Sequence, residues 1–264
     1  MAHIIMKNMM ISNSSKFALV TGASRGVGKE IAKALAAQGI NLVLHARKSS
    51  HLEALLEDLK VFNIETVTVE AELTDNASVH SMIDAVNAQT SHIDILYNNA
   101  AIMTPYRQNY WQIPAQDFAT SFAVNVTALV TICQAFAPAM IERGYGRIIN
   151  LTSGINAQPE LSPYAMSKAA VDRYVNDMAI KLTGTGVSMN LLDPGWLRTD
   201  LGGQDAPNVV ESVIPGALVP AFTPDSVNGQ TFGAQHYANL SLQQALDQEQ
   251  HRQVELSKKT GSME

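Results

Sequence analysis

The sequence predicts an α/β protein built on a doubly wound parallel β-sheet with helices on both faces. Short apolar segments rich in β-branched residues alternate with longer segments of helical periodicity between residues 16 and 195. The short segments are apolar throughout instead of alternating with polar residues, which is typical of parallel strands buried on both faces. In such a sheet, ligands bind at the carboxyl ends of the strands.

Each element follows from its local pattern. KFALVTG (16–22) begins the sheet, and in the helix expected next Ile31 and Leu35 share one face. The expected strands are 16–22, 41–46, 64–73, 94–99, 147–153 and 187–195, and the expected helices are 27–39, 51–62, one beginning near residue 74, 114–142 and 162–182. The rest is less regular. It contains a Pro/Gly-rich loop at 202–225, a possible strand at 230–237 and a polar, Gln-rich helix.

Composition limits the kind of protein. Of the 264 residues 46% are hydrophobic and 16% charged, and the net charge is −6 with basic residues scattered singly. This excludes a disordered chain and argues against a general nucleic-acid or anionic-membrane surface. The one cysteine, Cys133, lies in an apolar run, and no Cys/His cluster has zinc spacing. We therefore expect no disulfide framework and no metal site.

We expect one domain, residues 16–264, preceded by a flexible N-terminal leader at residues 1–15. In the leader, Lys7 and Asn8 interrupt a Met-rich apolar run. It is too short and too interrupted for a signal peptide or a membrane span, so we expect a cytoplasmic protein.

A glycine-rich turn, TGASRGVG, follows the first expected strand and precedes the first helix. Gly22, Gly26 and Gly28 would let the backbone approach a pyrophosphate closely, and the helix N-terminus offers amide groups and positive potential. The spacing G-x-x-x-G-x-G differs from the commoner G-x-G-x-x-G, and an ordinary glycine-rich turn is the alternative. Its position in the first βαβ unit favours a dinucleotide site, and with it a three-layer fold of the Rossmann type.

The residues at the end of the second expected strand indicate whether the dinucleotide is NAD or NADP. An acid there would bond the ribose hydroxyls of NAD, whereas an arginine would accept the 2′-phosphate of NADP. The segment LHARKSS has no acid but carries Arg47 and Lys48, and Arg25 in the glycine turn adds a second guanidinium. Each base could be a solvated surface charge. Together they favour NADP(H) over NAD(H).

Six motifs occur in a fixed order: TGASRGVG, NNAA after the fourth strand, a helical Asn125, LTS at the end of the fifth strand, YAMSK, and DPGWLRT. One Tyr-x-x-x-Lys arises easily by chance in a chain this long, but the ordered set does not. From about Lys16 to Thr199 the chain resembles the short-chain dehydrogenase/reductase family, in its single-domain branch of roughly 250 residues.

The resemblance implies a reaction centre of four residues, namely Asn125, Ser153, Tyr164 and Lys168. Ser153 would hold the substrate oxygen, and Asn125 would anchor a water that relays protons. Asn98 lies in the segment that would pack against the adenosine ribose and steady the sheet, and Thr199 would meet the nicotinamide carboxamide. The residues implied for the cofactor are Gly22, Ser24, Arg25, Gly26, Val27, Gly28, Arg47, Glu72, Leu73, Asn99, Ala100, Tyr164, Lys168, Pro194, Gly195 and Thr199.

The residues themselves suit that chemistry. Ser162 is a suitable helix N-cap and Pro163 a suitable first helical residue, so that Tyr164 and Lys168 would share one face at i,i+4. A free phenol has a pKa of about 10, which a nearby ammonium and an oxidised nicotinamide would together lower toward working pH. In the reducing direction Tyr164 would give its proton to the carbonyl oxygen while NADPH delivers hydride to the carbon.

The match to the family loosens in four places. Ala101 replaces the usual Gly of the fourth-strand motif, and Glu72 stands where an Asp is more usual. The gap from Ser153 to Tyr164 is slightly short, and the segment after DPGWLRTD is compact and Pro-rich. The resemblance implies a homodimer or homotetramer, with 115–142 and 162–183 as the dimer helices, but the last departure puts the tetramer and the usual substrates in doubt.

Substrate clues are few. Gln158, Trp196 and Leu197 flank the expected crevice, and the loop MTPYRQNYWQ (103–112) carries three aromatic residues. An apolar wall for a bulky ketone and a packing or interface role suit these aromatic residues equally well. No basic patch points to an acyl-carrier partner.

The leading hypothesis is an NADPH-dependent carbonyl reductase, or an alcohol dehydrogenase in reverse, acting on a small molecule. A sugar-nucleotide epimerase or dehydratase also uses Tyr-x-x-x-Lys, but usually with another glycine spacing and a longer chain. A cofactor-sensing protein without turnover is the alternative from a different class. Such a sensor would not need all four reaction-centre residues.

Overall fold

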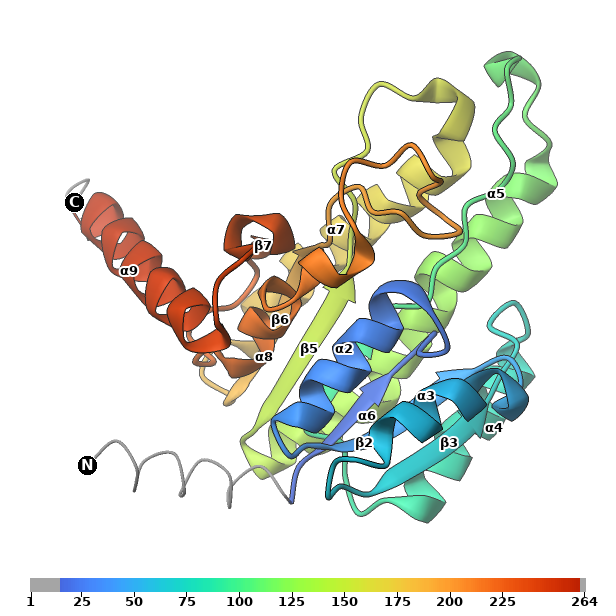
Figure 1. The fold of residues 1–264 in the computed structure, drawn as a ribbon. Coiled ribbons are helices and arrows are strands. Elements are labelled where there is room, and N and C mark those ends of the chain that lie inside the picture. The colour runs from blue at the N-terminus through green and yellow to red at the C-terminus, as the bar shows by residue number, and fades with distance from the viewer. Residues whose placement is uncertain (1–14, 262–264) are drawn as a thin grey trace, which may run out of the picture.

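The computed structural model describes residues 15–261, so the expected leader lies outside the described residues except for its last position. Within that range seven parallel strands form one sheet in the order β3-β2-β1-β4-β5-β6-β7 (Figure 1). The strands are β1 (Phe17–Val20), β2 (Asn41–Ala46), β3 (Thr66–Glu70), β4 (Ile95–Asn98), β5 (Gly146–Leu151), β6 (Val187–Asp193) and β7 (Thr231–Gly233). The predicted doubly wound parallel sheet is confirmed, with the reversal of strand order between β1 and β4.

Helices cover both faces of the sheet (Figure 1). One core includes side chains of α2 (Gly26–Ala37), α3 (Glu53–Leu59), α8 (Val219–Phe222) and the start of α9 (Leu242–Gly261). The other includes side chains of α4 (Asn76–Gln89), α6 (Leu129–Arg143) and α7 (Ser162–Leu182), and α5 (Ala115–Phe122) lies against α7. Successive residues of β1 point to opposite cores, since Ala18 lies in the first and Leu19 in the second. This two-sided burial is why β1 is apolar throughout, whereas the edge strand β3, TVTVE, is partly exposed and alternates with threonine.

The helix expected at 114–142 is continuous but not uniform, because a π-helical segment, Ala123–Ala128, joins α5 to α6. The whole stretch, Ala115–Arg143, is long and apolar enough by composition to cross a membrane, with a mean hydropathy of 1.7 in its most apolar window. Half of that window is buried inside the protein, as in the core helix of a folded domain. π-helical turns often occur at functional sites, and this one carries Asn125.

The C-terminal part differs from the expectation. Only Thr231–Gly233 of the possible strand 230–237 pairs with the sheet, and Ala234–Tyr237 form a 3-10 turn. Polar contacts hold α9 in place, because the buried carboxylate of Glu249 accepts a hydrogen bond from the Tyr237 hydroxyl at 2.6 Å. Arg252 of the same helix pairs with Glu249 at 2.7 Å and donates a hydrogen bond to the Gln230 side chain at 2.6 Å. The polar composition of this helix therefore reflects a side-chain network.

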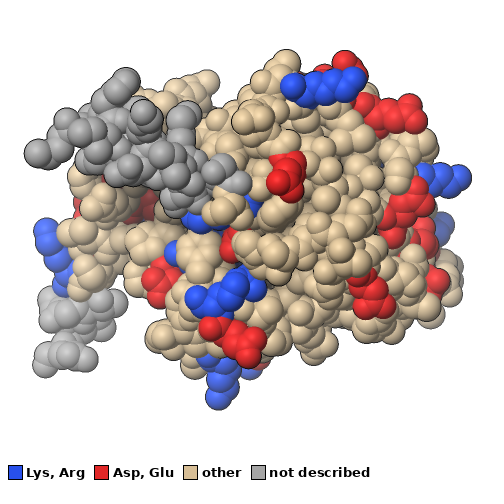
Figure 2. Space-filling view, turned by 90° about the horizontal axis from the view of Figure 1, so that it is seen from below, with Lys and Arg blue, Asp and Glu red and all other residues tan. Residues whose placement is uncertain are grey.

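Surface charges are mixed. On the face that Figure 2 shows, Lys and Arg side chains lie among Asp and Glu side chains. This matches the scattered basic residues of the sequence.

Candidate active site

Tyr164 and Lys168 lie on the first turns of α7, which spans the same residues, 162–182, as the expected helix. Leu161, not Ser162, is the N-cap, so that expectation was wrong. Ser162 is already helical, and its hydroxyl donates a hydrogen bond to the Pro159 carbonyl of the preceding 3-10 turn. Because the Ser162 hydroxyl bonds this turn, it does not cap the amides of the helix.

Lys168 is buried, with 4% of its surface exposed. Its Nζ donates a hydrogen bond to the Leu151 carbonyl oxygen at 2.7 Å and lies 5.7 Å from the centre of the Tyr164 ring. Burial lowers the pKa of Lys168 to about 8, against the opposing effect of the Asp172 carboxylate. The ammonium is therefore fixed at the end of β5, where Ser153 follows.

Tyr164 is also buried, and burial raises the pKa of its phenol. A hydrogen bond with the Ser153 side chain acts in the opposite direction, and the negative charge of Asp193 adds to the increase. The sequence had suggested a lowered pKa. In the structure burial outweighs the hydrogen bond, and the Lys168 ammonium is engaged with a backbone carbonyl instead of the phenol. The phenol is therefore protonated at neutral pH.

Asn125 lies in the π-helical segment, and both the oxygen and the nitrogen of its side chain form hydrogen bonds. Its Oδ1 accepts a hydrogen bond from the Ile102 amide at 2.9 Å, and its Nδ2 donates to the Ile102 carbonyl and to Ser167 Oγ, both at 2.9 Å. Ser167 in turn donates to the Tyr164 carbonyl at 2.7 Å. Asn125 thus connects the segment after β4 to the first turns of α7.

The glycine turn between β1 and α2 is tightly packed. Gly22 and Gly26 have φ of +66° and +57°, which favour glycine. A Cβ on Gly28 would collide with the carbonyl oxygen of Gly22 and with Nδ2 of Asn99. That Nδ2 donates hydrogen bonds to the Thr21 carbonyl at 2.8 Å and the Gly22 carbonyl at 3.2 Å. The turn is therefore held from the end of β4, and its close backbone packing fits the cradle that a pyrophosphate needs.

His45, at the end of β2, was missed by the sequence reasoning. Its Nδ1 accepts a hydrogen bond from the Gly22 amide at 3.1 Å, and its Nε2 lies 3.1 Å from the Ala71 carbonyl oxygen. These contacts require the neutral ring with its proton on Nε2. Burial lowers the pKa of His45, which favours that form. A histidine inside an apolar strand gives no local signal of such a bridge.

The basic residues expected at the 2′-phosphate all lie at the surface, but one of them, Arg25, already forms an ion pair. Arg25, the residue before α2, pairs with Asp200 at 2.7 Å, and both side chains are largely exposed, at 69% and 72%. Arg47 and Lys48 are exposed. The sequence reasoning noted no acid in this segment, but Glu70 at the end of β3 accepts a hydrogen bond from the Ser49 amide. Acidic groups from distant parts of the chain therefore lie close to two of the expected basic positions.

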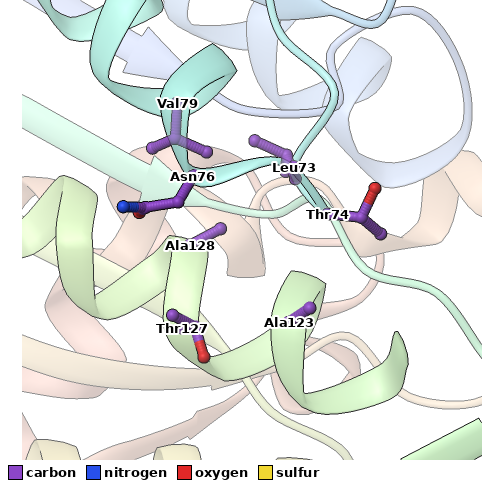
Figure 3. A pocket seen from close by; sticks show the side chains of 7 residues that line it. All are labelled: Leu73, Thr74, Asn76, Val79, Ala123, Thr127 and Ala128. Atoms are coloured by element: carbon purple, nitrogen blue, oxygen red, sulfur yellow. The ribbon is translucent and has the colours of Figure 1, made fainter. Parts of the chain in front are cut away.

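The two residues expected to face the adenine differ in their surroundings. Leu73 lines a small cavity of about 70 Å³ between the start of α4 and the π-helical segment, as Figure 3 shows. The Glu72 carboxylate accepts hydrogen bonds from the amide and the hydroxyl of Thr74 at 3.2 and 3.0 Å. Leu73 is thus largely buried in the core of that face, while the Glu72 carboxylate is engaged in the turn that leads to α4.

The NNAA segment is divided between the interior and the site. Asn98 is buried, and its Nδ2 donates hydrogen bonds to Asn150 Oδ1 at 2.8 Å and to Cys133 Sγ at 3.1 Å. Asn98 therefore supports the sheet from the interior. The amide of Ala100 donates a hydrogen bond to Thr21 Oγ1 at 3.0 Å. Burial raises the pKa of Cys133 to about 12, so the thiol is inert at neutral pH.

The segment after β6 returns to the glycine turn. Thr199 lies beside Gly26, since a Cβ on that glycine would be 3.6 Å from the Thr199 methyl carbon. Gly195 has φ of +81°, and the Pro194 carbonyl accepts a hydrogen bond from Gln235 at 2.9 Å. In the glycine turn itself Ser24 is half-buried, and Val27 packs partly against the core of that face. Residues from both ends of the expected cofactor site therefore approach the start of α2.

The expected substrate residues separate into two groups. Leu197 is buried in the core and does not flank a crevice, which corrects the expectation. Trp196 is exposed, and its Nε1 donates a hydrogen bond to the Gly202 carbonyl at 2.7 Å. In the loop 103–112 the aromatic side chains are exposed, most of all Trp111 at 86%. Among residues 15–261 no group of three His, Cys, Asp or Glu side chains is placed to hold a metal ion.

Comparison with known proteins gives consistent results for sequence and structure. A model of the short chain dehydrogenase family matches residues 16–209. The gluconate 5-dehydrogenase of Gluconobacter oxydans (strain 621H) is 34% identical over 194 residues, which cover 73% of this chain and 75% of that protein. The 3-oxoacyl-[acyl-carrier-protein] reductase of Synechocystis sp. is 32% identical over 195 residues, with 73% and 78% covered.

Among solved structures, a gluconate 5-dehydrogenase from Burkholderia cenocepacia J2315 in complex with NADP and tartrate superposes with a TM-score of 0.73 at 29% identity. The match covers 83% of this chain and 92% of that one. The motifs, the strand order and these relatives agree with one another.

Proposed function

The chain belongs to the short-chain dehydrogenase family and is an oxidoreductase, and we propose that it reduces a small ketone to an alcohol with NADPH, or catalyses the reverse oxidation, with Tyr164 as general acid and base. The observation that carries this proposal is the arrangement at the end of β5. There the Lys168 ammonium is held on the Leu151 carbonyl, and the Tyr164 phenol interacts with Ser153.

The state of the phenol favours the reducing direction. Because burial raises its pKa, Tyr164 carries its proton at neutral pH and can donate it to a carbonyl oxygen that is gaining electrons. Ser153 would hold the same oxygen by a hydrogen bond. Lys168 would place positive charge near the oxygen and bond the ribose hydroxyls of the nicotinamide nucleotide. When bound, NADPH supplies the hydride.

Asn125 has a positioning role in this proposal. Its side chain joins Ile102 to Ser167, and Ser167 bonds the backbone of Tyr164. These hydrogen bonds therefore fix the position of Tyr164 relative to the segment after β4. The proton-relaying water of the sequence-based hypothesis would be anchored from this same segment.

NADP(H) is the cofactor that we propose. The glycine turn lies at the start of α2, and Arg25, Arg47 and Lys48 offer positive charge on exposed side chains. The Burkholderia relative was crystallised with NADP. Thr199 and Gly195, on the far side of the turn, would border the nicotinamide half.

The test is NADPH and NADH oxidation at 340 nm over a panel of ketones and diketones, comparing wild type with Tyr164→Phe. Turnover with NADPH should fall by a factor of about 10² to 10⁴ in that variant. Tyr174→Phe removes a hydroxyl from the same helix, at a residue that contacts Cys133, and should keep activity. Turnover that survives in Tyr164→Phe would contradict the mechanism. NADPH binding without turnover of any carbonyl in the wild type would favour the cofactor-sensing alternative.

We also propose that two copies associate through α5–α6 and α7. Met166 and Ile180 on α7 are large apolar residues that are more than half exposed, the latter at 73%. A shared face would remove them from water. Light scattering should give the mass of a dimer or a multiple of it, and Ile180→Lys should shift the population toward the monomer.

A further inference from the structure

Asp193 is an acid at the edge of the reaction centre to which the reductase chemistry assigns no task. It is the last residue of β6, and Leu192 pairs with Leu151 of β5, so that Asp193 lies beside the chain that leads into Ser153. The Thr152 amide bonds the Leu192 carbonyl at 2.9 Å, which continues this alignment past the end of β5. The pairing of β5 with β6 therefore fixes the position of the Asp193 backbone, from which its carboxylate extends.

The two carboxylate oxygens of Asp193 have different surroundings. Oδ1 accepts a hydrogen bond from the Gly195 amide at 2.9 Å, which orients the group. Oδ2 points toward Gly154, since a Cβ at Gly154 would lie 3.0 Å from it. Gly154 directly follows Ser153, so this oxygen faces the backbone next to the proposed substrate-binding hydroxyl.

No cation neutralises this carboxylate within the described part of the chain. The ion pairs between described residues do not include Asp193. The buried ammonium of Lys168 is bonded to Leu151, and the carboxylate that acts on it is that of Asp172. The charge of Asp193 acts instead on the Tyr164 phenol. A substrate held between Ser153 and Tyr164 would therefore experience the negative charge of a carboxylate that no ion pair between described residues engages.

We propose that Asp193 determines the class of substrate: an uncharged ketone that carries a hydroxyl group near the carbonyl, or the corresponding diol in reverse, with carboxylates disfavoured. This inference rests on the proposed function, because it assumes that the substrate carbonyl lies at Ser153 and Tyr164. A half-buried carboxylate with a free acceptor oxygen binds a hydroxyl donor well, since hydrogen bonds to charged groups are stronger than neutral ones. It repels a carboxylate at the same place.

The test uses small ketones that differ only at the second carbon from the carbonyl. The probes are 4-hydroxy-2-butanone, acetoacetate and 2-butanone, with NADPH as reductant, and the proteins are wild type, Asp193→Asn and the control Asp205→Asn. Asn keeps an oxygen that can accept from the Gly195 amide, so the local backbone should stay in place. Asp205 is an exposed acid in the connection after β6, and it controls for a general loss of negative charge.

Wild type should prefer 4-hydroxy-2-butanone over acetoacetate by at least about tenfold in kcat/KM, and Asp193→Asn should narrow that ratio by about tenfold. Asp205→Asn should leave the ratio unchanged. The same ratio in wild type and Asp193→Asn, with turnover intact, would overturn this inference and leave the reductase function standing.

Calorimetric binding of the same ketones to the NADP⁺-saturated proteins separates the remaining outcomes. If no ketone is reduced but the binding preference still responds to Asp193→Asn, the proposed reduction fails and the role of Asp193 stands. If the wild type binds acetoacetate as tightly as 4-hydroxy-2-butanone, or binds neither, the inference is wrong.

Discussion

The ammonium nitrogen of Lys168 lies 2.7 Å from the backbone carbonyl oxygen of Leu151, the last residue of β5. This contact joins the first turns of α7 to the strand end that leads into Ser153. It also holds a positive charge where little water reaches, as the lowered pKa of about 8 indicates. The protein therefore keeps a cation in place at a cost to its own stability.

Replacing Lys168 with Met should make the protein more stable and inactive. Shifting the pKa from 10.5 to about 8 corresponds to about 3 kcal/mol of unfavourable free energy for the charged form, so we expect a gain of roughly 1–3 kcal/mol in the free energy of unfolding at pH 7. The unfolded chain holds this proton up to about pH 10.5, whereas the folded chain releases it near pH 8. Wild-type stability therefore rises with pH between these values, and the advantage of the variant should disappear there.

Urea unfolding of wild type and Lys168→Met at pH 7 and at pH 10 checks both expectations. Lys181→Met, at the exposed end of α7, is the matched control and should show no such pH-dependent difference. A Lys168→Met protein that is less stable than wild type at pH 7 would show that the Leu151 hydrogen bond outweighs the cost of burial.

His45 should make the glycine turn sensitive to acid. Its pKa is lowered in the folded protein, so below pH 6.5 the unfolded chain binds the proton more readily and stability falls as the pH falls. The slope contributed by one such group reaches about 1.4 kcal/mol per pH unit. His45→Ala should lack this contribution, and at pH 7.5 it should be about 1–3 kcal/mol less stable because the Gly22 amide loses its acceptor.

The measurement for His45 is the unfolding free energy from pH 5 to pH 8. His80→Ala, which removes an exposed histidine of α4, should keep the wild-type slope. Equal slopes in His45→Ala and wild type would mean that other groups produce the acid sensitivity.

Gly28→Ala should abolish cofactor binding and destabilise the fold. The added Cβ would collide with the Gly22 carbonyl oxygen and with Asn99 Nδ2, so the turn must open or Asn99 must leave. Overpacking of this kind typically costs about 1–3 kcal/mol. Gly39→Ala is the control, because a Cβ there meets nothing within 4 Å and only the positive φ is strained. Fluorescence titration with NADPH should show lost binding in the first variant and normal binding in the second.

Asp200 should oppose NADP binding by engaging Arg25. The pair is exposed and therefore weak, so Asp200→Asn should raise affinity for NADPH by no more than about fivefold, and affinity for NADH much less. Arg25→Ala should weaken NADPH binding and remove the effect of Asp200→Asn in the double variant. Asp58→Asn is the control, because it breaks the 2.8 Å pair between Asp58 of α3 and Lys29 of α2. If NADPH and NADH affinities rise equally in Asp200→Asn, the 2′-phosphate does not compete for Arg25.

Local patterns predicted the elements well where one period dominates. The helix 162–182 has regular apolar spacing, and the strands are apolar because both faces are buried. The π-helical segment has no such signature, since Ala123–Ala128 continue the apolar character of the helices on either side. Its distinguishing feature is Asn125, whose partner Ile102 lies 23 positions away.

The site was predictable in its motifs and not in its contacts. The order of the glycine turn, Ser153 and the Tyr164–Lys168 pair predicted the family, which the family model confirms. The bridge from His45 to Ala71, the pairing of Arg25 with Asp200 and the approach of Asp193 to Gly154 depend on how distant segments meet. Each of these residues has an ordinary local explanation, as a core histidine or a surface charge. Only the tertiary structure gives them partners.

The buried pair Asn98 and Asn150 bears on how the chain finds its fold. Apolar residues make up the rest of β4 and half of β5, and on their own they would distinguish poorly between alignments of the two strands. In the native alignment the two asparagines are direct neighbours, and Asn98 donates to Asn150 at 2.8 Å. A slip of one position would set Asn98 against Ile149 or Leu151 and Asn150 against Asn99 or Tyr97, so the two side chains would lose their mutual hydrogen bond in the interior. The hydrogen-bonded pair of buried amides thus favours the native alignment of β4 with β5 over misaligned ones.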